Sequence, residues 1–200
     1  MGVDRNEKGK IWDWSNLGFE YIQTDKRYVS NYKDGKWDDG SLTSDANVVL
    51  NECAGVFQYA QTVFEGLKAY TTEDGRIVTF RPDLNAERMM DSAKRLEMPA
   101  FPKDRFLDAV TQTVKANAAW VPPFGSGATL YVRPYMLGSS PVIGVSPAKR
   151  VSVSYFDHSG RDHILKAGQS RSRSRYLTLT ERRRMGTGTH QGGVSITLWV

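Results

Sequence analysis

Two segments with helical periodicity stand between segments that alternate like strands, and this order limits the possible folds more than any other feature. Residues 84–96 and 103–118 each carry apolar side chains three or four positions apart. The apolar positions are Met89, Ala93, Leu96, Phe106, Val110 and Val114. Asp83 follows Pro82 and is expected to cap the first helix. Both helices are therefore predicted to bury one face.

Short alternating segments on either side of the helices predict strands. Residues 28–32 alternate and run into an Asp-Gly pair, which favours a tight hairpin turn. Residues 66–70 and 77–80 read as a second pair of strands with a polar connection, and residues 129–137 alternate again. We therefore expect an α+β fold in which helices pack on a mainly antiparallel sheet.

Charge divides the chain unequally. Residues 1–148 hold 17 Lys and Arg against 19 Asp and Glu, whereas residues 149–200 hold 10 against 3. The basic part includes Arg171–Arg175 and Arg182–Arg184 and has no sustained periodicity. This predicts a folded domain over residues 1–148 and a basic, irregular tail over residues 149–200. Taken by composition alone, such a tail is typical of a nucleic-acid-binding extension.

Composition also bears on location. No apolar run is long enough to span a bilayer, so no membrane segment is expected. The first ten residues are polar and charged, which argues against a secretion signal. Cys53 is the only cysteine, which excludes a disulfide within the chain and favours a reducing, cytoplasmic location.

Three segments together resemble a known family. Gln58 to Gly66 reads Gln-Tyr-Ala-Gln-Thr-Val-Phe-Glu-Gly, residues 81–95 read Arg-Pro-Asp-Leu-Asn-Ala-Glu-Arg-Met-Met-Asp-Ser-Ala-Lys-Arg, and residues 131–135 read Tyr-Val-Arg-Pro-Tyr. They resemble the branched-chain amino acid aminotransferases, which are fold-type-IV enzymes that use pyridoxal 5′-phosphate. The resemblance implies the small domain of such an enzyme. It also implies conversion of leucine, isoleucine and valine with 2-oxoglutarate into branched 2-oxo acids and glutamate.

The resemblance assigns roles to individual residues. A lone arginine in a helix such as Arg88 is more often a solvated side chain, but its register implies the arginine that binds the cofactor phosphate. A Tyr-x-Arg strand pair is ordinarily unremarkable, but here it implies a substrate pocket, with Arg133 near the distal carboxylate of glutamate or 2-oxoglutarate. The implied pocket residues are Tyr59, Phe64, Gly66, Tyr131, Arg133 and Val145. Tyr59 and Val145 match positions contributed by the neighbouring subunit, which implies a homodimer.

The lysine that should hold the cofactor covalently is out of place. The family carries it in a segment like His-Ile-Lys-Val-Gly, well downstream of Tyr-x-Arg. Lys166 lies in His163-Ile-Leu-Lys-Ala-Gly168, which has an extra residue and comes too early, so we expect no role for it. Thr189 to Gly193 stands near the expected place and has no lysine. The chain as written is therefore expected to be inactive.

The genetic code suggests a cause. With permitted codons read one nucleotide out of frame, Arg161 to Gly168 can encode Gly-Pro-Tyr-Phe-Lys-Gly-Gly, and Leu177 to Gly186 can encode Asp-Phe-Asp-Arg-Ala-Ala-Pro-Asn-Gly. Both resemble family segments, in the right order. We therefore interpret the tail as the out-of-frame remnant of the linker and of the start of a large domain that is otherwise missing. The slip is expected near residue 150.

Two other functions remain open. A related fold-type-IV enzyme, such as a D-amino acid aminotransferase or an aminodeoxychorismate lyase, would share Arg88 but should not reproduce both pocket segments. A non-catalytic protein with a basic arm for nucleic acid belongs to a different class. Salt-dependent binding to DNA or RNA that vanished on removal of residues 149–200 would support the second.

Overall fold

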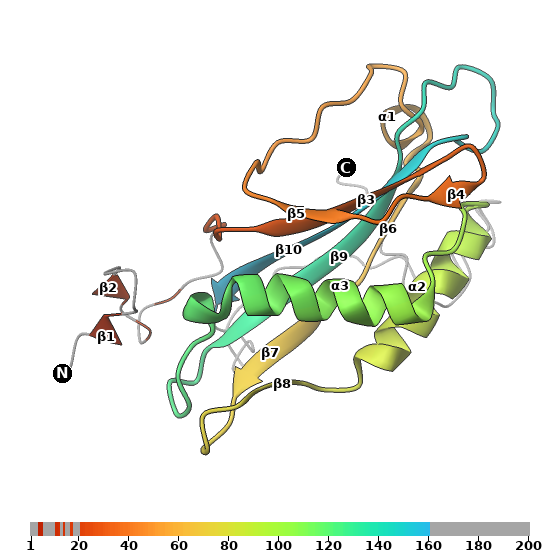
Figure 1. Cartoon of the computed structure of the whole chain (residues 1–200). Coiled ribbons are helices and arrows are strands. Elements are labelled where there is room, and N and C mark those ends of the chain that lie inside the picture. Colours follow the sequence, from red (N-terminus) through yellow and green to blue (C-terminus); the bar gives the residue numbers. More distant parts are fainter. Residues whose placement is uncertain (1–3, 6–10, 13, 15–16, 18–20, 161–200) are drawn as a thin grey trace, which may run out of the picture.

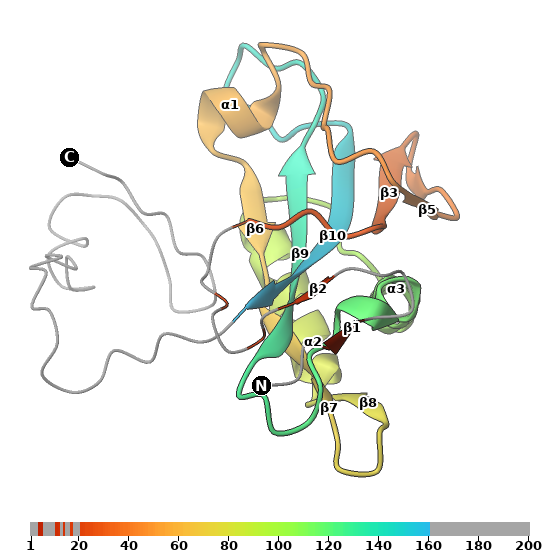
Figure 2. The same cartoon turned by 90° about the vertical axis from the view of Figure 1, so that its left-hand side faces the viewer.

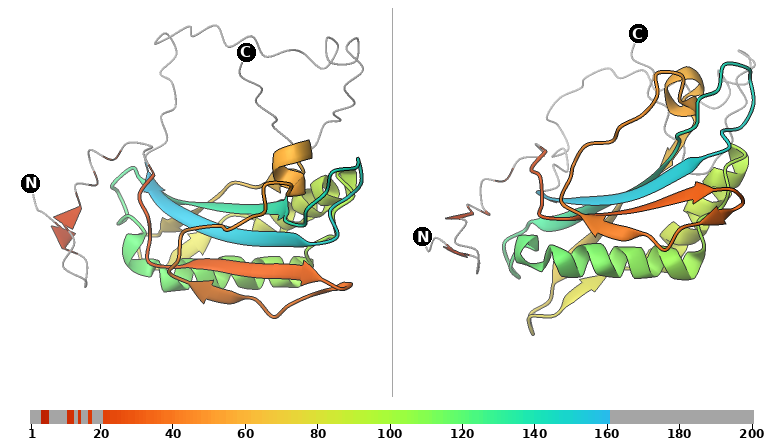
Figure 3. Two further views of the ribbon diagram at one scale, coloured as in Figure 1. Left: turned by 90° about the horizontal axis from the view of Figure 1, so that it is seen from above. Right: turned by 45° about the horizontal axis from the view of Figure 1, so that its top comes forward.

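The computed structural model describes residues 4–5, 11–12, 14, 17 and 21–160. Its main feature is one eight-stranded antiparallel sheet with two long helices on one face (Figures 1 and 3). The sheet strands are β3 (Arg27–Lys33), β4 (Lys36–Trp37), β5 (Ser41–Thr43), β6 (Thr62–Phe64), β7 (Leu67–Thr71), β8 (Ile77–Thr79), β9 (Thr129–Gly138) and β10 (Val151–Gly160). The helices are α1 (Gly55–Tyr59), α2 (Pro82–Arg95), α3 (Lys103–Ala116) and the 3₁₀ turn Ala118–Trp120. Two short strands, β1 (Asp4–Arg5) and β2 (Ile11–Trp12), pair with each other.

The longest strands lie at the centre of the sheet. The order is β4-β3-β10-β9-β7-β8, with β5 paired to β3 and β6 paired to β9. β9 and β10 pair along all ten residues, from Val151 opposite Gly138 to Gly160 opposite Thr129. The other edge of β10 pairs with β3. β10 therefore joins the two halves of the sheet.

The core lies between the sheet and the two long helices. Alternate residues of the central strands face α2 and α3, since successive side chains of a strand point to opposite faces. The apolar faces of the two helices pack against these residues. Tyr155 of β10 packs edge to face on Phe106 of α3, with ring centroids 5.4 Å apart. Buried members are Met89, Ala93, Phe106, Val110, Val114, Leu130, Val132, Met136, Val151, Val153 and Tyr155. The α+β architecture expected from the sequence is confirmed.

The predicted helices and strands are present, with ends that differ by one or two residues and one incorrect helix cap. The Asp-Gly pair forms the turn between β3 and β4, with both residues at positive φ as this hairpin type requires. α2 begins two residues earlier than expected. Its N-cap is Arg81 in a left-handed conformation, and Pro82 occupies the first turn. Asp83 is therefore not the cap. It lies inside the helix and accepts two hydrogen bonds from Arg81.

The expected boundary at residue 148 is wrong. Residues 151–160 form β10, which has partners on both sides, so the sheet continues twelve residues into the stretch assigned to an irregular tail. Val151, Val153 and Tyr155 are fully buried under the helices. The rest of the predicted tail, residues 161–200, lies outside the described residues. Within the described part of the chain, no helix is long and apolar enough to cross a membrane.

Candidate functional site

Three consecutive residues, the last of β6 and the two that lead to β7, connect most of the predicted site. Phe64 and Gly66 face the side of the sheet away from the helices, whereas Glu65 between them points towards α2 and is 1% exposed. The Glu65 amide donates to the carbonyl of Pro134 at 2.8 Å, which fixes the segment to β9. One short segment thus holds side chains on two faces of the sheet.

Arg88 reaches this segment from α2. Its Nε donates to Glu65 Oε1 and its Nη2 to Glu65 Oε2, both at 2.6 Å. This carboxylate raises the pKa of the Arg88 guanidinium further above its already high ordinary value. Asn85, one turn earlier, donates to Glu65 Oε2 at 2.8 Å and to the carbonyl of Gly66 at 3.3 Å. The first turns of α2 are therefore tied to the β6–β7 junction.

Arg133 lies on the opposite face, between two aromatic rings. Its Cζ is 4.6 Å from the centroid of the Phe64 ring and 5.2 Å from that of the Tyr131 ring. Its Nε and Nη2 donate to the Tyr131 hydroxyl at 3.1 and 3.0 Å. The structure brings these three predicted residues together. They form a cation held by two aromatic walls, which suits an acidic group beside an apolar one.

Gly66 is required for this arrangement. A Cβ added there would lie 2.5 Å from the Tyr131 hydroxyl oxygen and 3.1 Å from Cζ of the same ring. No side chain fits unless Tyr131 moves. The resemblance named Gly66 as a pocket residue, and the structure shows that Tyr131 is the side chain that approaches it.

Tyr59 and Val145 lie at the end of the sheet where α1 meets the loop 139–150 (Figure 2). The Tyr59 hydroxyl donates to the carbonyl of Ile143, and Tyr59 is 40% exposed. Val145 is 91% exposed, as is Ile143 at 83%. The structure therefore leaves an apolar loop uncovered at the end of the sheet, and the assignment of these residues to a neighbouring subunit stays a prediction. Lys166 lies outside the described residues.

Sequence reasoning missed Glu65, Asn85 and His158. The first two carry no local signal, because a partner 20 or 23 residues away defines their role. His158 pairs with Tyr131 across β10 and β9 and is buried. Burial, and then the charge of Arg133, lower the pKa of His158 below its ordinary value, which favours the neutral ring. The alternation of residues 151–155 could have revealed β10 and, with it, this histidine.

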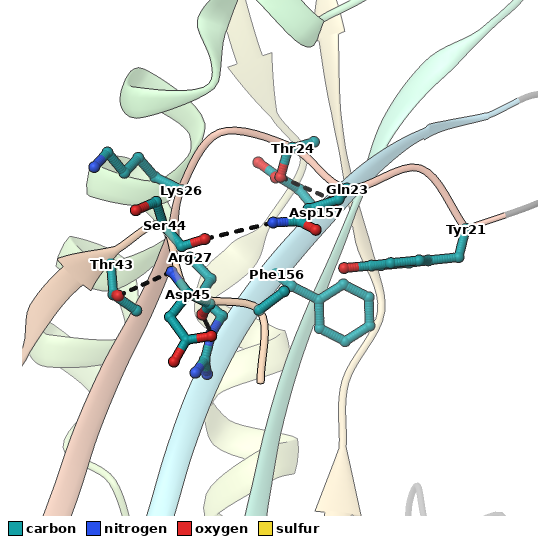
Figure 4. A pocket seen from close by; sticks show the side chains of 11 residues that line it. Tyr21, Gln23, Thr24, Lys26, Arg27, Thr43, Ser44, Asp45, Phe156 and Asp157 are labelled. Atoms are coloured by element: carbon teal, nitrogen blue, oxygen red, sulfur yellow. Dashed lines mark hydrogen bonds between the residues drawn. The ribbon is translucent and has the colours of Figure 1, made fainter. Parts of the chain in front are cut away.

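The structure also has a solvent-open hollow at a different place on the sheet (Figure 4). It runs between the start of β3, the loop after β5, and the residues Phe156 and Asp157 of β10. Arg27 in its wall uses its donors within the protein, since it donates to the carbonyls of Asp45 and Asn47 and to the hydroxyl of Ser154. Neither Arg88 nor Arg133 lines it. We therefore regard the hollow as a packing gap beneath the loop that follows β5, and not as the functional site.

Asp157 at the base of this hollow is buried and surrounded by hydrogen-bond donors. Thr24 donates to its Oδ1 at 2.7 Å, and Asn117 donates to Oδ1 and Oδ2 at 3.0 and 3.2 Å. Burial is the largest cause acting on this carboxyl, and it raises the pKa to about 7. Because Asn117 ends α3 and Thr24 precedes β3, Asp157 joins three elements of the fold.

The described residues fit the phosphate of pyridoxal 5′-phosphate at Arg88. Glu65 uses the Nε and one Nη2 hydrogen, which leaves both Nη1 hydrogens and the second Nη2 hydrogen as donors. The Arg88 side chain is 53% exposed, so these donors are accessible. A guanidinium edge of this kind binds phosphate oxygens well. Within the described residues, no cluster of His, Cys, Asp and Glu suits a metal ion.

The known proteins that this chain resembles in sequence are aminotransferases. No family model matches this chain. A branched-chain-amino-acid aminotransferase from Haemophilus influenzae is 50% identical over 147 residues, which are 74% of this chain and 43% of that protein. One from Helicobacter pylori is 40% identical over 184 residues, or 92% of this chain and 53% of that protein. A methionine aminotransferase from Arabidopsis thaliana is 44% identical over 76% of this chain and 43% of its own length.

Solved structures agree on the fold. A branched-chain aminotransferase from Thermoproteus uzoniensis, solved with norvaline, has a TM-score of 0.53 at 24% identity over 68% of this chain and 40% of that one. The enzyme from Escherichia coli has a TM-score of 0.52 at 21% identity over 68% of this chain and 41% of that one. Another branched-chain amino acid aminotransferase, solved with pyridoxamine 5′-phosphate, has a TM-score of 0.51 at 22% identity. The chain spans about half the length of the curated relatives it matches. In sequence and fold, it corresponds to the N-terminal part of the branched-chain-amino-acid aminotransferases.

Proposed function

We propose that this chain forms the small-domain side of a pyridoxal-phosphate site for branched-chain amino acid transamination. The observation that carries the proposal is the Phe64–Gly66 segment, which holds Arg88 through Glu65 on one face and Tyr131 and Arg133 on the other. An anion-binding arginine and an aromatic pocket are thus built on one rigid support.

Each residue has a distinct task in this proposal. Arg88 binds the cofactor phosphate and so fixes the position of the ring. Phe64 and Tyr131 form the wall against the aliphatic side chain, and Arg133 binds the distal carboxylate of glutamate or 2-oxoglutarate. The bound cofactor would supply the electron sink that makes the substrate Cα–H acidic. Tyr59 and Val145 would complete the pocket of a second subunit in a homodimer.

We also propose that the chain as written does not transaminate on its own. The described residues supply contacts for the phosphate and the substrate, but no segment of the sequence matches the family's His-Ile-Lys-Val-Gly pattern. A lysine is needed to hold the cofactor and to carry the proton between carbon atoms. A mixture of leucine, 2-oxoglutarate, cofactor and the chain should therefore form no glutamate.

A chimera tests the proposal directly. Residues 21–160 of this chain would replace the corresponding segment of the Haemophilus influenzae enzyme, which is 50% identical over the matched region. The folded chimera should transaminate leucine with 2-oxoglutarate. Arg133→Ala in the chimera should raise the KM for 2-oxoglutarate by roughly 10-fold or more, with a smaller effect on the KM for leucine.

The control variant is Arg76→Ala, which removes an exposed arginine from the β7–β8 connection and should leave both KM values unchanged. A folded chimera that binds pyridoxal phosphate but forms no glutamate would contradict the proposed function. An Arg133→Ala variant that raised both KM values equally would contradict the role given to Arg133.

A further inference from the structure

The contact between Glu65 and Arg88 is the most completely buried carboxylate interaction at the proposed site. Glu65 is 1% exposed, and both of its oxygens accept hydrogen bonds from the guanidinium at 2.6 Å. Burying a carboxylate is costly unless it is paired and hydrogen-bonded. The paired geometry is of the bidentate kind that gives such contacts their direction as well as their strength. The pair therefore fixes the plane of the Arg88 guanidinium.

Glu65 itself is held from three directions. Its amide donates to Pro134 of β9, and Asn85 donates to Oε2 at 2.8 Å. Its neighbours Phe64 and Gly66 are fixed against Arg133 and Tyr131 on the opposite face. The carboxylate is thus part of the rigid sheet, and a half-exposed arginine on a helix takes its position from it.

The pairing also decides which edge of Arg88 remains for a ligand. Glu65 binds the edge formed by Nε and Nη2, so the remaining donors lie on the edge formed by Nη1 and Nη2. An unpaired arginine side chain would have to give up rotamer freedom to present that edge. With Glu65 in place, most of that loss has already occurred in the free protein.

We propose that Glu65, supported by Asn85, is a positioning residue that presents the Nη1–Nη2 edge of Arg88 to the phosphate ester of the cofactor. This inference rests on the proposed function, because it takes Arg88 as the phosphate ligand. It assigns the specificity for a phosphate ester to a carboxylate that does not touch the ligand.

Charge repulsion and positioning predict opposite effects of Glu65 on phosphate affinity, which makes the inference testable. A carboxylate close to a phosphate dianion repels it, so removal of the Glu65 charge should tighten phosphate binding if charge dominates. If positioning dominates, the same change should weaken binding. Arg88→Ala cannot separate the two, since it would leave Glu65 buried without its partner and destabilise the fold.

The experiment uses the full 200-residue chain and Glu65→Gln. The probe is pyridoxine 5′-phosphate, which has the phosphate ester but no aldehyde to react with lysines, and pyridoxine is the unphosphorylated comparison. Binding is followed by NMR of the arginine Nε–H signals. In the unsubstituted chain, the Arg88 Nε–H should exchange slowly with water because it donates to a buried carboxylate, and the Arg88 signals should shift with the phosphate ester only.

In Glu65→Gln, we expect fast exchange of the Arg88 Nε–H and a dissociation constant about tenfold higher, which corresponds to about 1.4 kcal/mol. Glu87→Gln is the matched control. Glu87 precedes Arg88 on α2 and pairs with Lys103, so this variant also removes one negative charge close to Arg88. It should leave both the exchange rate and the affinity unchanged. Asn85→Ala should weaken binding by about twofold to threefold without any change of charge, and it decides the matter if Glu65→Gln does not fold.

The outcomes separate the two proposals. Equal or tighter binding by folded Glu65→Gln would overturn the positioning role and leave the proposed function standing. The same holds for unchanged binding by Asn85→Ala if Glu65→Gln does not fold. If the Arg88 signals of the unsubstituted chain respond equally to pyridoxine and to its phosphate, Arg88 is not the phosphate ligand, and both proposals fail.

Discussion

At the scale of single residues, Asp157 makes stability depend on pH. Its pKa is about 7 in the folded chain against an ordinary value of 3.8, so between these values the folded state keeps a proton that the unfolded chain loses. Its contribution to the free energy of unfolding is therefore fully present below about pH 4 and falls as the pH rises to about 7. The contribution is at most about 4 kcal/mol, at about 1.4 kcal/mol per unit.

Asp157→Asn should remove this dependence. The amide resembles the protonated carboxyl and can still accept hydrogen bonds from Thr24 and Asn117. Relative to the unsubstituted chain, the variant should gain stability as the pH rises from 4 to 7, and it should be the more stable form at pH 8. Urea unfolding at several pH values measures the difference. Asp39→Asn, at an exposed carboxyl, is the control for the loss of one charge. A flat difference for Asp157→Asn would contradict the argument.

Gly66 links residue geometry to the site. In Gly66→Ala the new methyl group would overlap the Tyr131 hydroxyl, and the partly exposed ring is expected to swing away. Arg133 would then lose both hydrogen bonds to Tyr131. We expect a stability loss of about 1 kcal/mol and a displaced Arg133 signal in NMR. Gly144→Ala, where an added Cβ meets nothing within 4 Å, should change neither. An unshifted Arg133 signal in Gly66→Ala would rule out this account.

At the scale of elements, β10 decides whether the sheet exists. It is the strand between β3 and β9, so its removal would separate β3, β4 and β5 from the rest of the sheet. A chain that stops after Gly160 should unfold cooperatively, whereas one that stops after Ala148 should not fold. Circular dichroism and thermal unfolding of the two shortened chains test this. A cooperative transition of the shorter chain at a similar temperature would refute the role given to β10.

The elements differ in how far the sequence predicts them. The two long helices and the strands around them follow from local periodicity, because burial against one core imposes that period on the sequence. β10 carries the same alternation at Val151, Val153 and Tyr155, but the excess of basic residues over the whole stretch 149–200 concealed it. A charge total averages over a segment and has no period. It therefore cannot place a boundary between elements.

The candidate site shows a different limit. Arg88, Tyr131 and Arg133 were predicted from motif register, and the structure ties them to one segment. Glu65 was not predicted, although it is in the middle of a motif, because its role depends on a helix residue 23 positions away. Pairs of this kind are set by tertiary packing, which no local pattern encodes. The same is true of Asp157 and its partners.

At the scale of the whole molecule, the structure of β10 restricts where the proposed nucleotide slip can lie. All ten residues of β10 pair in register with β9, so the codons through that of Gly160 are read in the frame of the sheet. A nucleotide slip near residue 150 would have changed that strand. We therefore expect a slip beyond the codon of Gly160, where the out-of-frame reading Gly-Pro-Tyr-Phe-Lys-Gly-Gly begins.

Sequencing the gene from before the codon of Ala148 to well beyond that of Val200 tests this expectation. A one-nucleotide difference after Gly160, followed by an open frame that reaches a lysine-containing segment, would give a protein able to hold the cofactor. A frame that is sound as printed would contradict the slip. The eight basic residues after Gly160 would then belong to the protein itself. In that case, DNA or RNA binding that weakens steeply with salt, and that is lost when residues 161–200 are removed, becomes the expected result.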